Sequence, residues 1–302
     1  MTRLKHFFRE SFRNRALIIM ALPGIILVFM FNYMPMFGIS IAFKSFNYGK
    51  GIMGSPWCGL DNFKMLITNM NVTSRIVRNT LGYYFLFTAV GTVANVALAI
   101  ALYECVFKRY AKVTQTIMIM PTFISFIAVT YIVNALFNNI LKSMGKETIN
   151  WYLSPQYWPA ILTVVNVWKG TGYGSIMYLS ALSGMDQEIF EAAQIDGATK
   201  GQQIRYITLP MLTGMICILL LLGLGGIMHS NTGLHYQVTK NVGLLYSTTQ
   251  TIDAFILNAL TSGSSNFGMN AAVTFFQSVV GCVMVVATNL IVRRWDPDKA
   301  LF

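Results

Sequence analysis

Charged residues are scarce in this sequence. Of its 302 residues only 11% are Asp, Glu, Lys or Arg, whereas 55% are hydrophobic and the mean hydropathy is +0.55. Soluble domains usually carry about 25% charged residues. The shortage of charge therefore argues against a soluble domain and indicates a membrane protein.

The residues of metal, redox and nucleotide chemistry are also few. The four cysteines, at positions 58, 105, 217 and 282, stand alone rather than in C-x-x-C pairs, and the three histidines form no H-E-x-x-H. The string KSMGKET at 142–148 lacks the first Gly and the Ser/Thr of a phosphate-binding P-loop. We therefore expect no catalytic residues, no metal site and no cofactor in this chain.

Long apolar runs, in contrast, are plentiful. Six stretches reach the roughly 20 residues that a helix needs to cross a bilayer. They lie near 16–43, 81–103, 113–137, 161–182, 207–228 and 271–292. The runs are too long and too uniform for barrel strands, and backbone groups in lipid must bond internally. We expect an all-α integral membrane protein, with 1–302 as a single domain and a kink or break at Pro35.

The distribution of Lys and Arg predicts the orientation. Basic residues gather in the N-terminal segment 1–15 and in the short loop ECVFKRYAK at 104–112, whereas those of the opposite loops are spread over longer segments. Cytoplasmic loops carry such an excess, so both termini are expected in the cytoplasm of a multi-pass protein. The net charge of +11 is then explained by this bias and by contact with membrane lipid, and no nucleic acid partner is indicated.

Ionisable residues are nearly absent from the six runs. Such residues within spans usually mark ion pathways, and secondary carriers often show inverted repeats that are not obvious here. An ion-coupled secondary transporter of a small solute stays open as an alternative, but its usual signs are missing.

The stretch EAAQIDGATKGQQIRYITLP, residues 191–210, lies in a polar loop at 184–206, between the fourth and fifth runs. Ser183 and Asp186 favour a helix start, and Gly197 can adopt the left-handed conformation that ends a helix. A second helical segment, KGQQIRYIT, then leads into a span opened by Leu209 and Pro210. A plain connection needs about 5 residues, so this loop suggests a docking element.

The docking interpretation assigns a partner to the first helix. The side chain of Phe190, buried in a partner's groove, would contribute about 1.5–3 kcal/mol. The alternative is an amphipathic helix that rests on the lipid headgroups.

The same stretch carries a family resemblance. The spacing E-A-A-x3-G-x9-I-x-L-P is matched at every fixed position and resembles the EAA motif of the membrane subunits of bacterial ABC importers. Three further segments are similar to the LplB-like permeases of the maltose-type sugar importers: LPGIILVFMFNYMPMFGISIAFKSFN, GSPWCGLDNFKMLI and VGLLYSTTQTIDAFILNAL.

This resemblance implies a type I importer fold with a cytoplasmic coupling helix. It also implies three partners: a second, homologous permease, a cytoplasmic ABC ATPase dimer that holds ATP and Mg, and an extracellular solute-binding protein. The implied ATPase-coupling residues are Phe190, Glu191, Ala192, Ala193, Asp196, Gly197, Ala198, Leu209 and Pro210. A structural or signalling membrane protein with a similar helix is the remaining rival.

The resemblance also implies oligosaccharides or polysaccharide fragments as substrates. Sugar sites combine aromatic faces with amides and hydroxyls, and two of the runs offer such side chains. The candidates for the substrate path are Tyr131, Asn134, Asn166, Trp168, Lys169, Tyr173 and Tyr178. These residues also have ordinary structural interpretations. Trp168 and Lys169 would anchor the helix at the membrane interface, and Tyr173 would form a hydrogen bond between helices. The neighbouring Gly170, Gly172 and Gly174 would be helix-packing positions.

Overall fold

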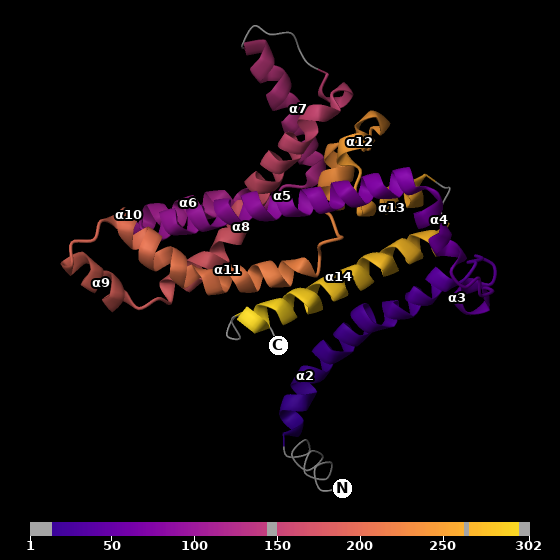
Figure 1. Cartoon of the computed structure of the whole chain (residues 1–302), viewed down its shortest axis with the longest axis horizontal. Coiled ribbons are helices and arrows are strands. Elements are labelled where there is room, and N and C mark those ends of the chain that lie inside the picture. The colour runs from indigo at the N-terminus through magenta and orange to yellow at the C-terminus, as the bar shows by residue number, and fades with distance from the viewer. Residues whose placement is uncertain (1–13, 144–149, 263–265, 296–302) are drawn as a thin grey trace. The chain divides into compact units, whose positions relative to one another are not determined.

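The computed structural model describes residues 14–143, 150–262 and 266–295 (Figure 1). Within these residues the regular elements are helices, and one isolated antiparallel bridge joins Lys44 and Trp57. The chain divides into two compact units, Met1–Thr68 with Asn266–Phe275, and Asn69–Ser265 with Phe276–Phe302.

The first unit contains the long N-terminal helix. It begins as α2 (Arg15–Val28), passes through a π turn, η1 (Phe29–Tyr33), and continues as a 3₁₀ helix, η2 (Met34–Phe43). Pro35 lies in the first turn of η2, so the expected break occurs as a change of helix type. Three short helices follow: α3 (Gly51–Gly54), η3 (Asp61–Phe63) and α4 (Lys64–Thr68).

The second unit is built around α8 (Trp158–Ser183). This helix packs against α5 (Met70–Tyr103), α6 (Lys108–Phe123) and α11 (Leu209–Leu224). A Cβ on Gly172 would lie 1.9 Å from the Met118 carbonyl oxygen of α6, and one on Gly174 would lie 2.4 Å from the Asn95 amide of α5. The two glycines are therefore packing positions at which the helix backbones approach closely.

The remaining elements complete this unit. They are α7 (Phe126–Ser143), η4 (Trp151–Leu153), η5 (Pro155–Tyr157), α9 (Gln187–Ile195), α10 (Lys200–Gln203), η6 (Ile204–Thr208), η7 (Gly233–Val238), η8 (Gly243–Leu245), α12 (Tyr246–Thr249) and α13 (Ile252–Thr261). Helix α14 (Phe267–Trp295) starts in the first unit and ends in the second.

Among the described residues, four helices are long and apolar enough to cross a membrane, and a bent pair makes up to five. The four are Arg15–Phe43, Met70–Tyr103, Lys200–Leu224 and Phe267–Arg294. The expected fourth span, near 161–182, lies on α8, which is a helix of 26 residues but is not among the four. Its middle holds polar residues and glycines, and its neighbours are three other helices rather than lipid alone.

The expected third span, near 113–137, is not one straight helix. It is broken between α6 and α7, whose axes bend by 104°. Pro121 lies in the last turn of α6 and has no N–H to donate to the preceding turn. Hydropathy did not reveal this break because the sequence is apolar on both sides of it.

Candidate functional site

Helix α9 has a well-defined start and end. The Asp186 carboxylate caps it, accepting a hydrogen bond of 3.0 Å from the N–H of Glu188. At the other end Gly197 has φ +81°, and the N–H of Ala198 donates to the Ala193 carbonyl oxygen over 2.9 Å. The Gly197 N–H donates to Gln194, which completes a Schellman motif. The left-handed Gly197 is therefore confirmed.

The segment after Gly197 differs from the prediction. Instead of a short helix followed by a separate span, one helix runs from Lys200 to Leu224. It starts at a capping box between Thr199 and Gln202, and the π turn η6 comes just before Pro210. A π turn absorbs the disturbance that proline causes without ending a helix. The elbow at Gly197 is thus joined directly to the span.

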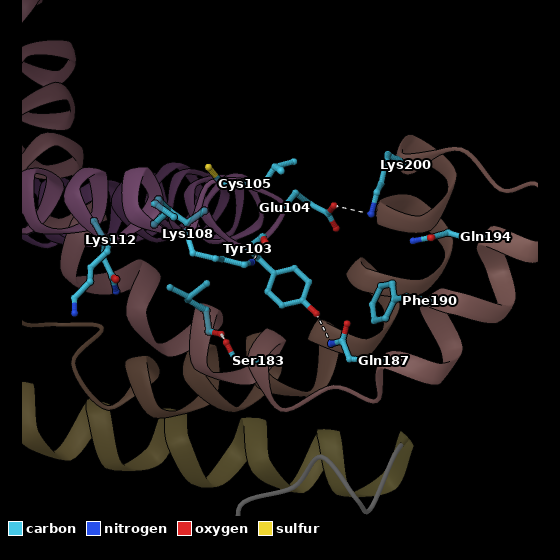
Figure 2. A pocket seen from close by; sticks show the side chains of 15 residues that line it. Tyr103, Glu104, Cys105, Lys108, Lys112, Ser183, Gln187, Phe190, Gln194 and Lys200 are labelled. Atoms are coloured by element: carbon cyan, nitrogen blue, oxygen red, sulfur yellow. Dashed lines mark hydrogen bonds and ion pairs between the residues drawn. The ribbon is translucent and has the colours of Figure 1, made fainter.

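The side chain of Phe190 packs inside its own chain. Its side chain is only 5% exposed and its ring centroid lies 6.5 Å from that of Tyr103, at the end of α5 (Figure 2). Gln187 donates a 2.6 Å hydrogen bond to the Tyr103 hydroxyl, and Lys200 forms a 3.0 Å ion pair with Glu104. The expectation that Phe190 fills a partner's groove is therefore wrong, because its own chain already buries it.

The opposite face of α9 is exposed. Glu191 and Ala192 are exposed and Ala193 is half-buried. Ile195 is 86% exposed, and the sequence reasoning missed it. Ile195 comes four residues after Glu191, so helical spacing alone could have placed it on this face.

The rest of the coupling residues surround the elbow. Asp196 and Gly197 are exposed, and Ala198 is half-buried. Leu209 and Pro210, at the start of α11, are exposed as well. Figure 1 shows α9 and α10 together at one end of the second unit, beyond the ends of α8 and α11.

The candidate substrate residues fall into three groups. Tyr131, Trp168 and Tyr173 are 69%, 41% and 64% exposed, Asn134 and Asn166 are half-buried, and Lys169 and Tyr178 are buried. Tyr131 and Asn134 lie on α7, which packs chiefly against η7 rather than α8. The structure therefore does not bring all seven together.

One small cavity does lie beside Asn166. It has a volume of about 180 Å³ and separates α5 from α8. Its polar lining consists of Thr88, Thr92, Asn95, Asn166 and Thr171. These hydroxyls and amides are the groups that hydrogen-bond to a neutral polar solute.

Lys169 has a structural partner. Its ammonium donates to the carbonyl oxygens of Pro121 (2.8 Å), Thr122 (3.4 Å) and Ile124, and it lies 4.8 Å from the centre of the Phe126 ring. The Thr122 hydroxyl donates back to the Lys169 carbonyl oxygen over 2.7 Å. Lys169 thus binds carbonyl groups at the break between α6 and α7, of which that of Pro121 also accepts a 3.2 Å hydrogen bond from the Ile124 N–H.

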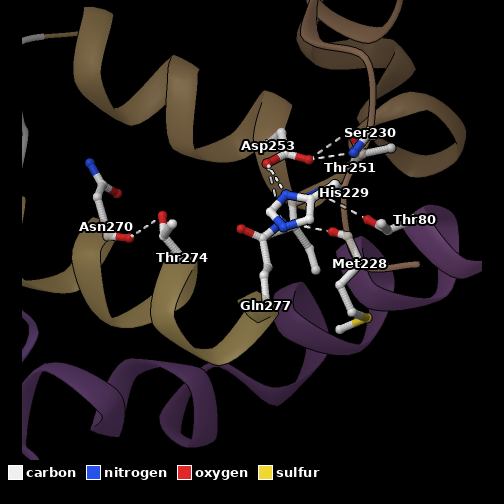
Figure 3. Close-up of polar contacts among 10 residues, drawn as sticks. Thr80, Met228, His229, Ser230, Thr251, Asp253, Asn270, Thr274 and Gln277 are labelled. Carbon is white, nitrogen blue, oxygen red and sulfur yellow. Dashed lines mark hydrogen bonds and ion pairs between the residues drawn. The ribbon is translucent and has the colours of Figure 1, made fainter. Parts of the chain in front are cut away.

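A polar network that the sequence did not reveal follows α11 (Figure 3). Asp253 of α13 accepts hydrogen bonds from the Ser230 N–H and, over 3.2 Å, from Gln277 of α14. His229 lies 3.5 Å from the same carboxylate. Gln277 also donates to the Met228 carbonyl oxygen over 2.7 Å. The network ties α13 and α14 to the turn that follows α11.

This network shifts two pKa values. The hydrogen bond with Asp253 raises the pKa of His229, although burial opposes the shift. Burial alone would raise the pKa of Asp253, but the hydrogen bonds from His229, Ser230 and Gln277 outweigh it and hold that pKa below its usual value. Among the described residues, no group of three or more His, Cys, Asp or Glu side chains is placed to hold a metal ion.

Comparison with known proteins agrees with this geometry. Residues 95–297 match the family described as "Binding-protein-dependent transport system inner membrane component". Protein LplB of Bacillus subtilis (strain 168) is 30% identical over 294 residues, covering 95% of this chain and 91% of LplB. The polygalacturonan/rhamnogalacturonan transport system permease protein YteP of the same organism is 29% identical, covering 97% of this chain and 92% of YteP.

A solved structure is similar over nearly the whole chain. It is a bacterial ABC transporter involved in the import of the acidic polysaccharide alginate, with TM-score 0.84 and 30% identity, covering 96% of this chain and 99% of the matched one. This chain therefore belongs to the family of binding-protein-dependent transport system inner membrane components, as a multi-pass permease subunit of an ABC transporter that is not itself an enzyme and has no cofactor of its own.

Proposed function

We propose that this chain is one permease subunit of an importer, folded as a single transmembrane domain over 1–302. Its six spans are the four apolar helices, the bent pair α6–α7, and α8, whose polar middle is accommodated among other helices. Both termini lie in the cytoplasm. The basic residues of 1–15 and of the α5–α6 turn support this orientation.

In this proposal α9 is the element that docks on a cytoplasmic ATPase dimer. The observation that carries it is the Schellman elbow at Gly197, which joins an exposed short helix directly to the helix Lys200–Leu224. The docking face comprises Glu191, Ala192 and Ile195. Closure of the ATPases would move α9, and the continuous helix would pass that movement to the bundle as rigid-body rocking.

The complex would also contain a second, homologous permease and an extracellular solute-binding protein. A solved alginate ABC transporter, similar to this chain with TM-score 0.83, is in complex with a periplasmic protein bound to an alginate pentasaccharide. The family description likewise names a binding-protein-dependent system. We expect the two permeases to differ, so that they form a heterodimer.

The proposed substrates are oligosaccharides or polysaccharide fragments. The relatives support this class, because YteP belongs to a polygalacturonan/rhamnogalacturonan system and the solved transporter is involved in alginate import. Within the chain, the exposed aromatic rings of Tyr131, Trp168 and Tyr173 and the half-buried amides of Asn134 and Asn166 would line the path. The buried Lys169 and Tyr178 are left out of it.

Uptake measurements on Tyr173→Ala test this path. The side chain is 64% exposed, so its loss should lower uptake while assembly and basal ATPase activity stay normal. Tyr110→Ala is the matched control, since Tyr110 is 70% exposed at the start of α6 and outside the proposed path. A loss of assembly in Tyr173→Ala without a specific transport defect would instead assign Tyr173 to packing between subunits.

A further inference from the structure

A large cavity lies between α9 and the turn that joins α5 to α6 (Figure 2). Its volume is about 760 Å³, and residues of α5, α6, α8, α9 and α10 line it. The contacts of Phe190 and Gln187 with Tyr103 form part of its wall. The proposed docking of α9 leaves this cavity without a role, because it lies on the face of α9 that is turned toward its own chain.

The charged residues of this lining are mostly basic. Lys108, Lys112 and Lys200 line it against a single acidic residue, Glu104. Glu104 is already paired with Lys200 at 3.0 Å, and Lys108 donates a 3.2 Å hydrogen bond to the Tyr103 carbonyl oxygen. The Lys112 ammonium makes no hydrogen bond or ion pair within the described part of the chain. The cavity therefore has an excess of positive charge that favours an anion.

The surroundings of the cavity indicate what carries that anion. Val106, Phe107 and Tyr110 are 85%, 67% and 70% exposed, and they alternate with Lys108 and other basic residues around the start of α6. Apolar side chains interspersed with Lys and Arg are typical of a segment at the headgroup level of a membrane. The cavity lining also includes Leu102, Leu179 and Phe190, which can contact an acyl chain but add nothing to the binding of a free ion.

We propose that this cavity binds the phosphate of an anionic phospholipid such as phosphatidylglycerol. Basic pockets between membrane helices on the cytoplasmic side suit such headgroups, and the inference rests on the proposed function for that orientation. The phosphate would lie between Lys108 and Lys112 of α6 and Lys200, which begins the helix after the elbow. Bound lipid would then fasten the coupling segment to the end of α5.

The test measures lipid binding by the purified, detergent-solubilised complex. Phosphatidylglycerol or phosphatidylcholine is added, and the bound lipid is detected by native mass spectrometry. Lys112→Gln should weaken phosphatidylglycerol binding about fivefold, and the double variant Lys108→Gln with Lys112→Gln about thirtyfold. Each Lys near a membrane surface contributes about the same factor to the affinity for an anionic lipid. Arg109→Gln is the matched control. Arg109 neighbours Lys108 on the same turn but is not among the described residues that line the cavity.

Cys105 supplies a second readout, because it lines the cavity. In a variant with Cys58, Cys217 and Cys282 changed to Ser, phosphatidylglycerol should slow thiol labelling at Cys105 and phosphatidylcholine should not. Equal loss of lipid binding in Lys112→Gln and Arg109→Gln would overturn the proposal, since only general surface charge would then act. Protection of Cys105 by inorganic phosphate as strong as that by the lipid would overturn the lipid assignment.

Failure of this inference is distinguishable from failure of the proposed function. Lipid binding is measured on the membrane subunits whether or not the ATPase stays attached. A complex that retains its ATPase normally yet binds no anionic lipid counts against the lipid site alone.

Discussion

Lys169 holds the joint between α6 and α7 through three backbone carbonyl groups. Their residues lie between 45 and 48 positions away in the chain. A buried carbonyl group without a hydrogen-bond donor costs about 1–3 kcal/mol. The 104° bend between α6 and α7 interrupts the helical hydrogen bonds at this point. One ammonium group with three donors meets this need.

Replacing Lys169 tests this role. Lys169→Met keeps the length of the side chain but removes its donors, so we expect a loss of about 3 kcal/mol in stability because three carbonyl groups lose this donor, although that of Pro121 keeps the Ile124 N–H. The measurement is the melting temperature of the purified complex in detergent. Lys64→Met is the control, because Lys64 pairs with Asp61 on the surface and is 74% exposed. Equal melting temperatures for the two variants would show that the ammonium does not support the break.

Single positions differed in how far the sequence predicted them. Gly197 was predictable because its left-handed backbone depends on local sequence alone. Lys169 and Phe190 were not, since both were assigned partners outside the fold. Their true contacts come from α6 and α5, and these are set by tertiary packing that sequence spacing does not describe.

Helix α9 has one buried and one exposed face. Phe190 packs inward on Tyr103, while Ile195 points outward and is 86% exposed. In the proposed function, Ile195 belongs to the face of α9 that docks on the ATPase.

The two faces predict opposite phenotypes. Ile195→Lys should reduce the amount of ATPase that co-purifies and leave the melting temperature of the membrane subunits unchanged. Phe190→Ala should lower that melting temperature, because truncating a buried Phe costs about 3–5 kcal/mol. Pull-down and thermal unfolding of both variants check this. Full ATPase retention by Ile195→Lys would show that this face does not dock.

The network around Asp253 predicts a pH dependence of stability. A raised pKa at His229 contributes stability that is complete below its ordinary value of 6.5 and is lost as pH rises through the raised pKa. The lowered pKa of Asp253 contributes stability above its ordinary value of 3.8, which is lost as pH falls through the lowered pKa. The combined contribution is therefore largest between these two ordinary values.

Thermal unfolding of the wild type and His229→Gln between about pH 5 and about pH 9 tests this sign. The wild type should be the more stable at the acidic end, and the difference should shrink as pH rises. A difference that does not vary with pH would show that His229 contributes by packing rather than by its charge.

The assembled transporter should contain two different permeases. The helices of this chain expose apolar side chains widely, and the family resemblance is to one of a pair of subunits. Purification of the tagged chain from its own host, with identification of the accompanying proteins, checks this. Recovery of a stable, ATPase-bound homodimer would contradict the heterodimer.

The number of spans shows how far hydropathy alone describes the molecule. Hydropathy located the four apolar helices well, because a helix that crosses lipid needs apolar side chains. Hydropathy also indicated α8. The middle of this helix is polar because it contacts α5, α6 and α11 rather than lipid alone. The α6–α7 break was invisible to it, since the break is made by Pro121 and a distant lysine.

The central claim is that the elbow couples this permease to an ATPase, and Gly197→Val tests it most directly. Among the described residues no atom lies within 4 Å of a Cβ built on Gly197, so the cost comes from its φ of +81° and is about 1–2 kcal/mol. Gly201→Val is the control, because Gly201 also has open space but an ordinary helical backbone.

The measurement is ATPase retention and binding-protein-stimulated hydrolysis in reconstituted complexes of Gly197→Val, Glu191→Lys and the Gly201→Val control. We expect normal membrane insertion throughout, with retention or stimulation lost in the first two variants and kept in the control. Wild-type retention and stimulation in both Gly197→Val and Glu191→Lys would contradict the assignment of residues 191–210 as the coupling element.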